Sequence, residues 1–243
     1  MNTRKIIIAN WKMYKPHQEA LDWLDSYFEE LDELTQFHDI ILCPEFTTLA
    51  DAAKILQTTS ISLGAQDCSS HEAGAFTGQI PAHSLADIDC TYCLVGHSEV
   101  KKHCCDTPQT VIHKTWQLLK YDIIPILCFA DATKNTQEFL KELGSYLQGK
   151  HTNKQTIMFA YEPLESIGAL HDSPESIAQI LATLASCAQA ALPRFEHKYL
   201  YGGGVNSHSI AQLAGIPSLD GFLVGKASLD FQSLKKIVLS IHT

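Results

Sequence analysis

Short apolar runs recur along the whole chain and set the pattern of its secondary structure. Each run is rich in Ile, Leu, Val, Tyr or Phe and ends in polar residues or glycine, which is typical of a buried β-strand. Eight such runs predict strands within residues 5–10, 39–45, 60–66, 92–97, 123–130, 156–162, 198–203 and 220–228.

The segments between these runs have helical spacing. Apolar residues recur three or four positions apart, as at Leu24, Phe28 and Leu31, and this gives one side of a helix an apolar face. A Thr-Pro pair at 107 and a Ser-Pro pair at 173 are typical helix starts. The pattern predicts helices within residues 17–36, 46–57, 107–121, 135–148, 173–192, 207–214 and 233–241, and a shorter one within 81–88.

Strands and helices therefore alternate, and this favours a parallel sheet that is covered on both faces or closed into a barrel. Eight strand and helix pairs in 243 residues match a (β/α)8 barrel. No Gly, Ser or Pro-rich linker divides the chain, so we expect one domain over residues 1–243. A doubly wound open sheet is the alternative, in which ligand groups would gather at a single switch point.

The carboxyl ends of the predicted strands carry most of the candidate functional residues. In a (β/α)8 barrel these ends meet at one mouth, where active sites lie. The residues expected there are Asn10, Lys12, Glu45, Gln66, His97, Glu99, Asp131, Glu162, Gly202, Gly203, Gly204, Gly225 and Lys226.

Charge and hydropathy limit the classes of partner. The formal net charge is -9 at pH 7, and no basic run offers an electrostatic site for nucleic acid or an anionic membrane. No apolar segment approaches the roughly 20 residues that span a bilayer, and the first residues lack a signal-peptide core. We therefore expect a cytoplasmic protein that binds neither nucleic acid nor membrane.

The eight cysteines are expected to be reduced, because several lie inside apolar strand runs. Cys90 and Cys93 form a C-x-x-C pair, but residues three apart in a strand point to opposite faces. A metal site at this pair is therefore disfavoured.

Several residues at the predicted mouth suit proton transfer next to a carbonyl group. Glu162 can accept a proton, and a loop that closed over it and excluded water would strengthen it as a base. His97 can donate a hydrogen bond to a carbonyl oxygen, and Lys12 supplies positive charge. Glycines at 202–204 and at 225 allow backbone N–H groups to approach a phosphate. Taken singly, these residues also fit a strand-end acid, a structural histidine, a surface lysine and tight turns.

A set of motifs in a fixed order resembles the triosephosphate isomerase family. The motifs cover the whole chain, and VGHSE together with AYEP is the most specific combination. They are NWKM at 10–13, GAQD at 64–67, GAFTGQ at 74–79, VGHSE at 95–99, AYEP at 160–163, YGGGVN at 201–206 and DGFLVGKAS at 220–228.

The resemblance implies a role for each matching residue in the interconversion of dihydroxyacetone phosphate and glyceraldehyde 3-phosphate, a step of glycolysis and gluconeogenesis. Glu162 would be the base and His97 the neutral electrophile. Asn10 and Lys12 would polarise and hold the substrate, with Glu99 beside them. Neither a cofactor nor a metal is implied. The phosphate would be bound by Gly168, Gly204, Gly225 and Lys226, together with Asn10 and Lys12. Thr77 would insert against the active site of a partner subunit, so the resemblance also implies a homodimer.

The lid that follows Glu162 departs from the family pattern. Glu165 stands where the family has tryptophan, and Leu170 where it has a second glycine, while Ile167 remains as the residue that would cover the base against Leu223. Glu165 is expected to repel Asp131 and so to bias lid closure. The lid comprises Pro163, Leu164, Glu165, Ser166, Ile167, Gly168, Ala169 and Leu170.

Three further departures concern the expected dimer contact and the phosphate turn. Gln79 and Val100 replace a glutamate and an arginine, so the contact should be less ionic. Gly204 replaces a serine. Lys226 replaces a glycine, so it either adds charge at the phosphate or strains the backbone if the position has a positive φ.

Two alternative functions stay open at this point. The altered lid and phosphate turn would also suit isomerisation of a related four-carbon ketose phosphate. A weakly active binding protein with the same barrel is the other alternative, although it would have no reason to keep Asn10, Lys12, His97 and Glu162 together.

Overall fold

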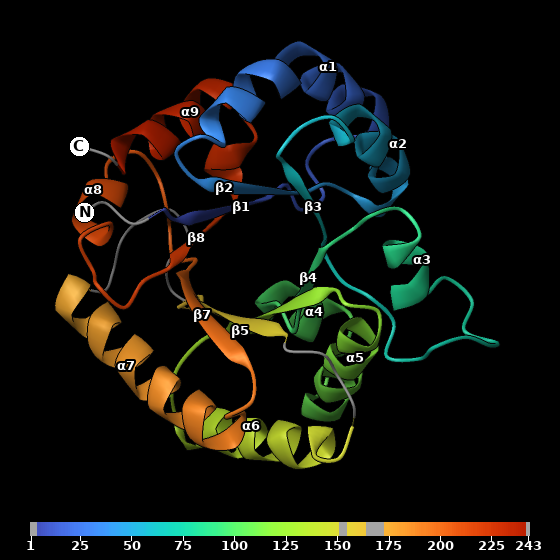
Figure 1. The fold of residues 1–243 in the computed structure, drawn as a ribbon, viewed down its shortest axis with the longest axis vertical. Helices are drawn as coiled ribbons and strands as arrows, with labels where there is room; N and C mark the ends of the chain where they lie inside the picture. Colours follow the sequence, from blue (N-terminus) through green and yellow to red (C-terminus); the bar gives the residue numbers. More distant parts are fainter. Residues whose placement is uncertain (1–3, 151–154, 164–172, 242–243) are drawn as a thin grey trace.

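The computed structural model describes residues 4–150, 155–163 and 173–241. Eight parallel strands close into a barrel in the order of the sequence, and helices form a ring around it (Figure 1). The (β/α)8 prediction is confirmed, and the open sheet was wrong. The strands are β1 (Ile6–Asn10), β2 (Asp39–Cys43), β3 (Ser62–Ala65), β4 (Tyr92–Val95), β5 (Ile124–Phe129), β6 (Thr156–Tyr161), β7 (Glu196–Tyr201) and β8 (Gly221–Val224).

The helices lie where the apolar spacing predicts them, with two additions, α4 and a 3-10 turn, η1, at the end of the run predicted as the last strand. Helix α4 was missed because none of its residues is buried and its sequence, SEVKKH, has no apolar periodicity. The described helices are α1 (His17–Leu34), α2 (Phe46–Leu56), α3 (Ala82–Ala86), α4 (Ser98–His103), α5 (Pro108–Lys120), α6 (Lys134–Leu147), α7 (Pro174–Ala191), α8 (Ile210–Leu213), α9 (Phe231–Ser240) and the 3-10 turn η1 (Lys226–Ser228).

Side-chain chemistry fixes both predicted helix starts. The Thr107 hydroxyl accepts the backbone N–H of Thr110, and the Thr110 hydroxyl accepts the N–H of Thr107. The hydroxyl of Ser173 accepts the N–H of Ser176. Each bond satisfies an N–H group that the first turn of a helix leaves unpaired.

The core has two layers because side chains alternate along each strand. Ile7 and Ala9 of β1 pack outward against the helices, whereas Ile6 and Ile8 fill the barrel interior. The interior cluster also contains Ile41, Cys43, Leu94, Ile126, Cys128, Met158, Ala160, Leu200 and Leu223. Because of the same alternation, the side chain that comes two residues after the last interior residue of a strand points into the mouth of the barrel.

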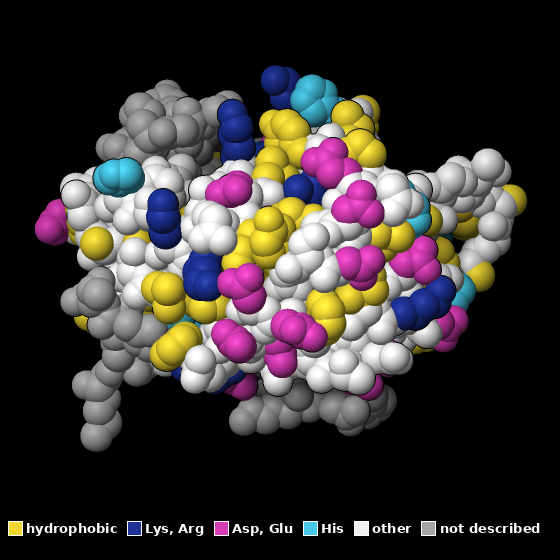
Figure 2. Space-filling view, turned by 90° about the horizontal axis from the view of Figure 1, so that it is seen from above, with side chains coloured by type: hydrophobic (Ala, Val, Ile, Leu, Met, Phe, Trp, Pro, Cys, Tyr) yellow, Lys and Arg dark blue, Asp and Glu magenta, His cyan; other side chains and the backbone are white. Residues whose placement is uncertain are grey.

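Figure 2 shows acidic and basic side chains interspersed over the face in view, without a continuous basic patch. Within the described ranges, no helix combines the length and the apolar character that crossing a bilayer requires. All eight cysteines are free.

Candidate active site

Strand alternation places a polar residue after the inward apolar side chains of two strands. Asn10 follows Ile8 on β1 and is buried. Glu162 follows Ala160 on β6, and its backbone N–H continues the ladder by donating to the Phe129 carbonyl at 2.7 Å. Both side chains therefore enter the barrel mouth from a strand or from the residue directly after one.

His97 and Glu162 are in direct contact at this mouth. The distance between His97 Nε2 and Glu162 Oε1 is 3.2 Å, and the imidazole is 5% exposed. Glycine on the neighbouring strand makes room for the carboxylate, since a Cβ at Gly202 would lie 2.7 Å from Glu162 Cγ. The structure thus brings the predicted base and the predicted electrophile together.

The N-terminus of α4 determines which ring nitrogen of a neutral His97 carries the hydrogen. As the residue before the helix, His97 accepts the backbone N–H of Glu99 at Nδ1, at a distance of 3.2 Å. A nitrogen that accepts an N–H carries no proton, so a neutral ring has its hydrogen on Nε2, the atom that faces Glu162. His97 is therefore set up to donate a hydrogen bond into the mouth.

The pKa of His97 reflects two opposing influences. Burial lowers it, but the hydrogen bond to Glu162 and the charges of Glu162 and Glu99 outweigh burial, so the pKa is raised above its ordinary value. A substrate placed between the two side chains would separate the imidazole from Glu162. Burial and the charge of Lys12 would then favour the neutral ring.

Lys12 connects the histidine side of the mouth with the glycine turn after β8. The Nζ atom of Lys12 lies 2.6 Å from Glu99 Oε1, and the backbone N–H of Lys12 donates to Asn10 Oδ1 at 3.1 Å. A Cβ at Gly225 would lie 3.7 Å from Lys12 Cε. Lys12 thus contacts both Asn10 and Glu99.

Three of the residues expected to bind phosphate, Gly204, Gly225 and Lys226, occupy turns after β7 and β8. Gly204 has a φ of 58°, a left-handed conformation in which the Cβ of a serine would be strained. Gly225 precedes η1, and Lys226 begins it without a positive φ. The strain considered for Lys226 is therefore absent. Gly168, another of the expected phosphate-binding residues, lies outside the described residues.

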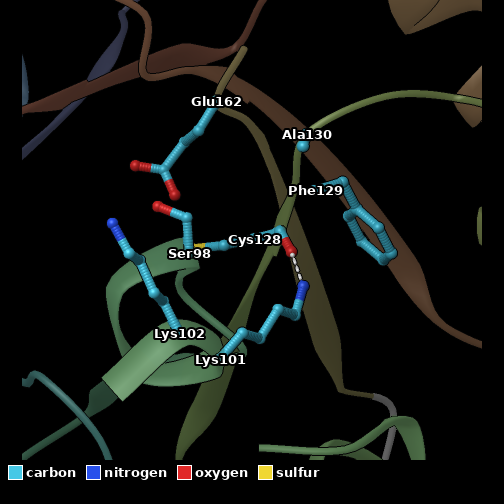
Figure 3. Close-up of a pocket in the computed structure, with 7 residues that line it drawn as sticks. All are labelled: Ser98, Lys101, Lys102, Cys128, Phe129, Ala130 and Glu162. Atoms are coloured by element: carbon cyan, nitrogen blue, oxygen red, sulfur yellow. Dashed lines mark hydrogen bonds between the residues drawn. The ribbon is translucent and has the colours of Figure 1, made fainter. Parts of the chain in front are cut away.

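A cavity of about 350 Å³ lies beside Glu162 (Figure 3). The Ser98 hydroxyl points toward the Glu162 carboxylate, and Lys101 Nζ donates to the Cys128 carbonyl at 3.0 Å. Burial, together with the nearby Glu162 charge, raises the pKa of the Cys128 thiol well above its usual value. The cavity is lined by Ser98, Lys101, Lys102, Cys128, Phe129, Ala130 and Glu162.

Of these seven residues, sequence reasoning named only Glu162 as a candidate and missed the other six. The position of Cys128 had a usable signal, because it lies two residues after the inward Ile126 on β5. Ser98 and Lys101 belong to the missed helix α4.

Most of the lid predictions fall outside the described residues. This holds for residues 164–170, including Glu165, Ile167 and Leu170, whereas Pro163 is described. The supposed repulsion between Glu165 and Asp131 therefore stays a prediction. Burial opposes ionisation of Asp131, but hydrogen bonds from Thr133 and Thr136 outweigh it and lower its pKa.

The predicted dimer segment projects from the body. Residues 68–80 leave the barrel after β3 and extend to the right beside α3 in Figure 1. Thr77 is exposed on this segment. Gln79 Oε1 accepts the Ser69 hydroxyl at 2.7 Å, so Gln79 supports the base of its own segment.

The C-x-x-C pair is buried among strand residues, and Cys93 Sγ lies 3.3 Å from the Leu94 carbonyl. In the part of the chain that the structure describes, no three His, Cys, Asp or Glu residues are grouped to hold a metal ion.

Comparison with known proteins supports the interpretation of the motifs. A family model described as triosephosphate isomerase matches residues 5–241. The triosephosphate isomerase of Dictyoglomus thermophilum is 35% identical over 251 aligned residues, which cover 98% of this chain and 99% of that protein. That of Aquifex aeolicus is 33% identical, with 98% and 99% covered. That of Thermus thermophilus is 33% identical, with 95% and 96% covered.

Proposed function

The chain belongs to the triosephosphate isomerase family, and we propose that it interconverts dihydroxyacetone phosphate and D-glyceraldehyde 3-phosphate. One observation carries this proposal: Glu162 Oε1 and His97 Nε2 lie 3.2 Å apart in the barrel mouth, with Nδ1 of the histidine occupied as an acceptor. A base and a neutral hydrogen-bond donor are the two groups that an aldose-ketose isomerisation requires.

In the proposed reaction, the substrate enters between these two side chains. Glu162 takes the proton from C1 of the ketose, while the Nε2–H of His97 donates to the carbonyl oxygen and stabilises the enediolate. Glu162 then returns the proton to C2. A second proton passes from the C1 hydroxyl oxygen to the C2 oxygen, and the electrons shift so that C1 becomes the aldehyde and C2 carries the hydroxyl. Only a proton moves between carbon atoms, so the proposed chemistry needs neither a cofactor nor a metal.

Lys12 has two tasks in this scheme. Its ammonium balances the charge of the developing oxyanion and attracts the dianionic phosphate. Its position between Glu99 and Gly225 supports both tasks. We propose that the phosphate binds at the turns of Gly204, Gly225 and Lys226, with Gly168 completing the site. An enediolate phosphate exposed to water would lose its phosphate, which gives the lid residues their proposed role.

Turnover measured with two substrates tests this function. The rate with glyceraldehyde 3-phosphate would be compared with the rate with a four-carbon aldose phosphate for wild type and Glu162→Asp. We expect the three-carbon substrate to be preferred and Glu162→Asp to lower kcat about 100-fold or more, since the shorter side chain withdraws the base. Glu142→Asp, an exposed change on α6, is the matched control.

Other outcomes would assign another function. Preference for the four-carbon substrate would favour isomerisation of a longer ketose phosphate. No turnover of either substrate would favour a binding protein.

We also propose that the chain acts as a homodimer in the cytoplasm. Support comes from the projecting segment 68–80 and from large apolar side chains that are exposed: Met13 is 88% and Tyr14 58% exposed just after β1, and Phe76 is 41% exposed on the projecting segment. A surface that another protein covers often carries exposed side chains of this kind. In the proposed dimer, Thr77 reaches the active site of the partner subunit.

A further inference from the structure

Two adjacent cysteines, Cys104 and Cys105, are exposed directly after α4. Of the other six cysteines, five are buried and Cys187 is half-buried. Burial raises the pKa of the Cys90 thiol to about 12, and a thiol in such surroundings is inert because it is not ionised at neutral pH. The two thiols most open to a reagent in solution are therefore those of the Cys104–Cys105 pair.

The backbone at Cys105 is one that cysteine rarely adopts. Its φ is 61°, in the left-handed region. Glycine and short polar residues occupy this region at less cost, and Asp89 and Asp122 are examples in this chain. Because Cys105 is also exposed, neither backbone preference nor core packing explains a cysteine here. The thiol itself is the property that distinguishes this residue.

Adjacency determines what kind of bond the two thiols can form. Consecutive Cα atoms lie about 3.8 Å apart, whereas the Cα atoms of an ordinary disulfide lie about 4.4–6.8 Å apart. A disulfide between neighbours is therefore strained, and a strained, exposed disulfide is more easily reduced than a structural one. A bond within the Cys104–Cys105 pair would form and break reversibly.

The pair links two anchored parts of the chain. On one side, the Cys104 N–H donates to the Val100 carbonyl of α4 at 2.8 Å. On the other side, Asp106 Oδ1 lies 2.7 Å from Lys114 Nζ, which also lies 2.8 Å from Asp67 Oδ2. Closing a small ring at the pair changes the backbone between these anchors, so α4 or the ion cluster must move with it.

Helix α4 carries several groups of the barrel mouth. His97 precedes it and accepts the Glu99 N–H at Nδ1, and Glu99 Oε1 lies 2.6 Å from Lys12 Nζ. The Ser98 hydroxyl, at the first position of the helix, points toward the Glu162 carboxylate (Figure 3). A displacement of α4 therefore reaches both the proposed base and the proposed electrophile.

The charges next to the pair favour an anionic reagent. Lys101, Lys102 and His103 form the last turn of α4 and are exposed. The carboxylate that follows the pair, on Asp106, is buried and paired with Lys114. The chain around the two thiols is thus locally positive and attracts a small disulfide that carries carboxylate groups.

We propose that Cys104 and Cys105 form a reversible modification site, a dithiol that an anionic low-molecular-weight disulfide of the oxidised-glutathione type converts into an internal disulfide. One cysteine thiolate attacks a sulfur of the small disulfide, its S–S bond breaks, and one small thiol leaves as a mixed disulfide forms. The neighbouring thiolate then attacks the protein sulfur of the mixed disulfide, and the second small thiol leaves. The protein loses two electrons and two protons, and the small disulfide gains them as it becomes two thiols.

Peptide mapping after incubation with oxidised glutathione tests the bond itself. Trypsin cleavage after Lys102 and Lys114 releases peptide 103–114, which contains both cysteines of the pair and no other. We expect its mass to fall by two hydrogens and to recover after dithiothreitol. Unchanged thiols, a lasting mass increase by one glutathione, or a covalent link between two chains on a non-reducing gel would each overturn the proposal.

The effect on turnover of triose phosphate rests on the proposed function. Oxidation should lower kcat/KM about 10-fold, because a displaced α4 misplaces the reacting groups, and reduction should restore it. Cys105→Gly removes one thiol and suits a left-handed φ, so it should be as active as wild type and insensitive to oxidised glutathione. Cys104→Ser should behave alike if the glycine variant folds poorly. Cys187→Ser, on α7, is the matched control and should respond as wild type does. Inactivation of Cys105→Gly and Cys104→Ser to the same extent as wild type would contradict the assignment.

Imidazole NMR follows α4 without relying on turnover. The His97 signals should shift on oxidation, whereas those of His197 on β7 should not. A closed ring with unchanged His97 signals would sink the link to α4. If wild type failed to turn over the triose phosphate, the proposed function would fall, but the peptide masses and the His97 signals would still decide this proposal.

Discussion

His97 Nε2 and Glu162 Oε1 lie 3.2 Å apart although their side chains come from β4 and β6, which are separated in the barrel by β5. The contact depends on the inward direction of both side chains at the mouth and on the absence of a Cβ at Gly202. In the free protein each group therefore occupies part of the space that a substrate would take. Binding must separate them, and this links substrate binding to the protonation of His97.

Glu99→Gln should lower the pKa of His97. The Glu99 carboxylate is one of the charges that raise this pKa in the folded protein. A raised histidine pKa favours the fold below the unfolded value of about 6.5, and this contribution is lost as the pH rises through the folded pKa. Imidazole NMR titrations should show the His97 midpoint moving to lower pH in the variant. His197, whose pKa is lowered by burial, serves as the internal control.

Gly202→Ala should damage catalysis more than stability. The new Cβ would lie 2.7 Å from Glu162 Cγ and 3.3 Å from Oε1, so the carboxylate must move. We expect kcat to fall about 10–100-fold, because the base leaves its productive position. Gly215→Ala is the matched control, since a Cβ there meets nothing within 4 Å. Equal kinetics in the two variants would show that the glycine does not set the position of Glu162.

The buried ion cluster around Lys114 should respond unequally to the loss of its members. Burial lowers the pKa of Lys114, but its two aspartates outweigh burial and raise it, whereas burial of Asp67 outweighs Lys114 and raises the pKa of that carboxyl. Lys114→Met would leave a partly buried carboxylate, Asp67, and a buried one, Asp106, without this cation, and it should reduce the free energy of unfolding by about 3 kcal/mol. Asp67→Asn should change it by about 1 kcal/mol or less, since it removes a charge whose burial is unfavourable. Urea unfolding at one protein concentration measures both, and a larger loss for Asp67→Asn would reverse this assignment.

Lys226→Gly should weaken inhibition by inorganic phosphate. Lys226 starts η1 without a positive φ, so glycine would relieve no strain there and would remove a charge near the proposed phosphate site. The inhibition constant should rise several-fold, and more so at low ionic strength, where charges act over longer distances. Lys236→Gly on α9 controls for net charge. Tighter inhibition in Lys226→Gly would contradict a helpful lysine.

The two-residue period of the strands was sufficient to predict the fold and the positions of Asn10 and Glu162 in the site. Alternate inward positions lead from Ile6 and Ile8 to Asn10, and from Met158 and Ala160 to Glu162, so a two-residue period was enough to place these side chains. Only β7 began earlier than predicted, at Glu196, because pairing with Thr156 on β6 extends it beyond its apolar part.

The remaining features depend on contacts between residues distant in sequence. The acceptor role of His97 appears only when α4 forms, and that helix has no apolar face to signal it. Lys12, whose φ is 53°, accepts at its carbonyl oxygen a hydrogen bond from Gln66, which lies 54 positions away. Neither contact produces a pattern in the local sequence. The motif resemblance therefore identified Lys12 and His97, but it did not show which residues fix their conformation.

A homodimer with a weakly ionic contact is the last prediction. Gln79 bonds to Ser69 of its own segment, and Val100 carries no charge, so neither residue supplies a charged partner across the expected contact. Sedimentation at micromolar concentration should give twice the chain mass of 26.9 kDa, with little change between low and high salt.

Phe76→Ser should dissociate the dimer and reduce activity, because Phe76, 41% exposed and stacked on His71, lies on the projecting segment. Leu239→Ser, at 40% exposure on α9, is the matched control and should remain dimeric. A wild-type monomer with full activity would remove the need for Thr77 of a partner subunit and overturn the dimer proposal.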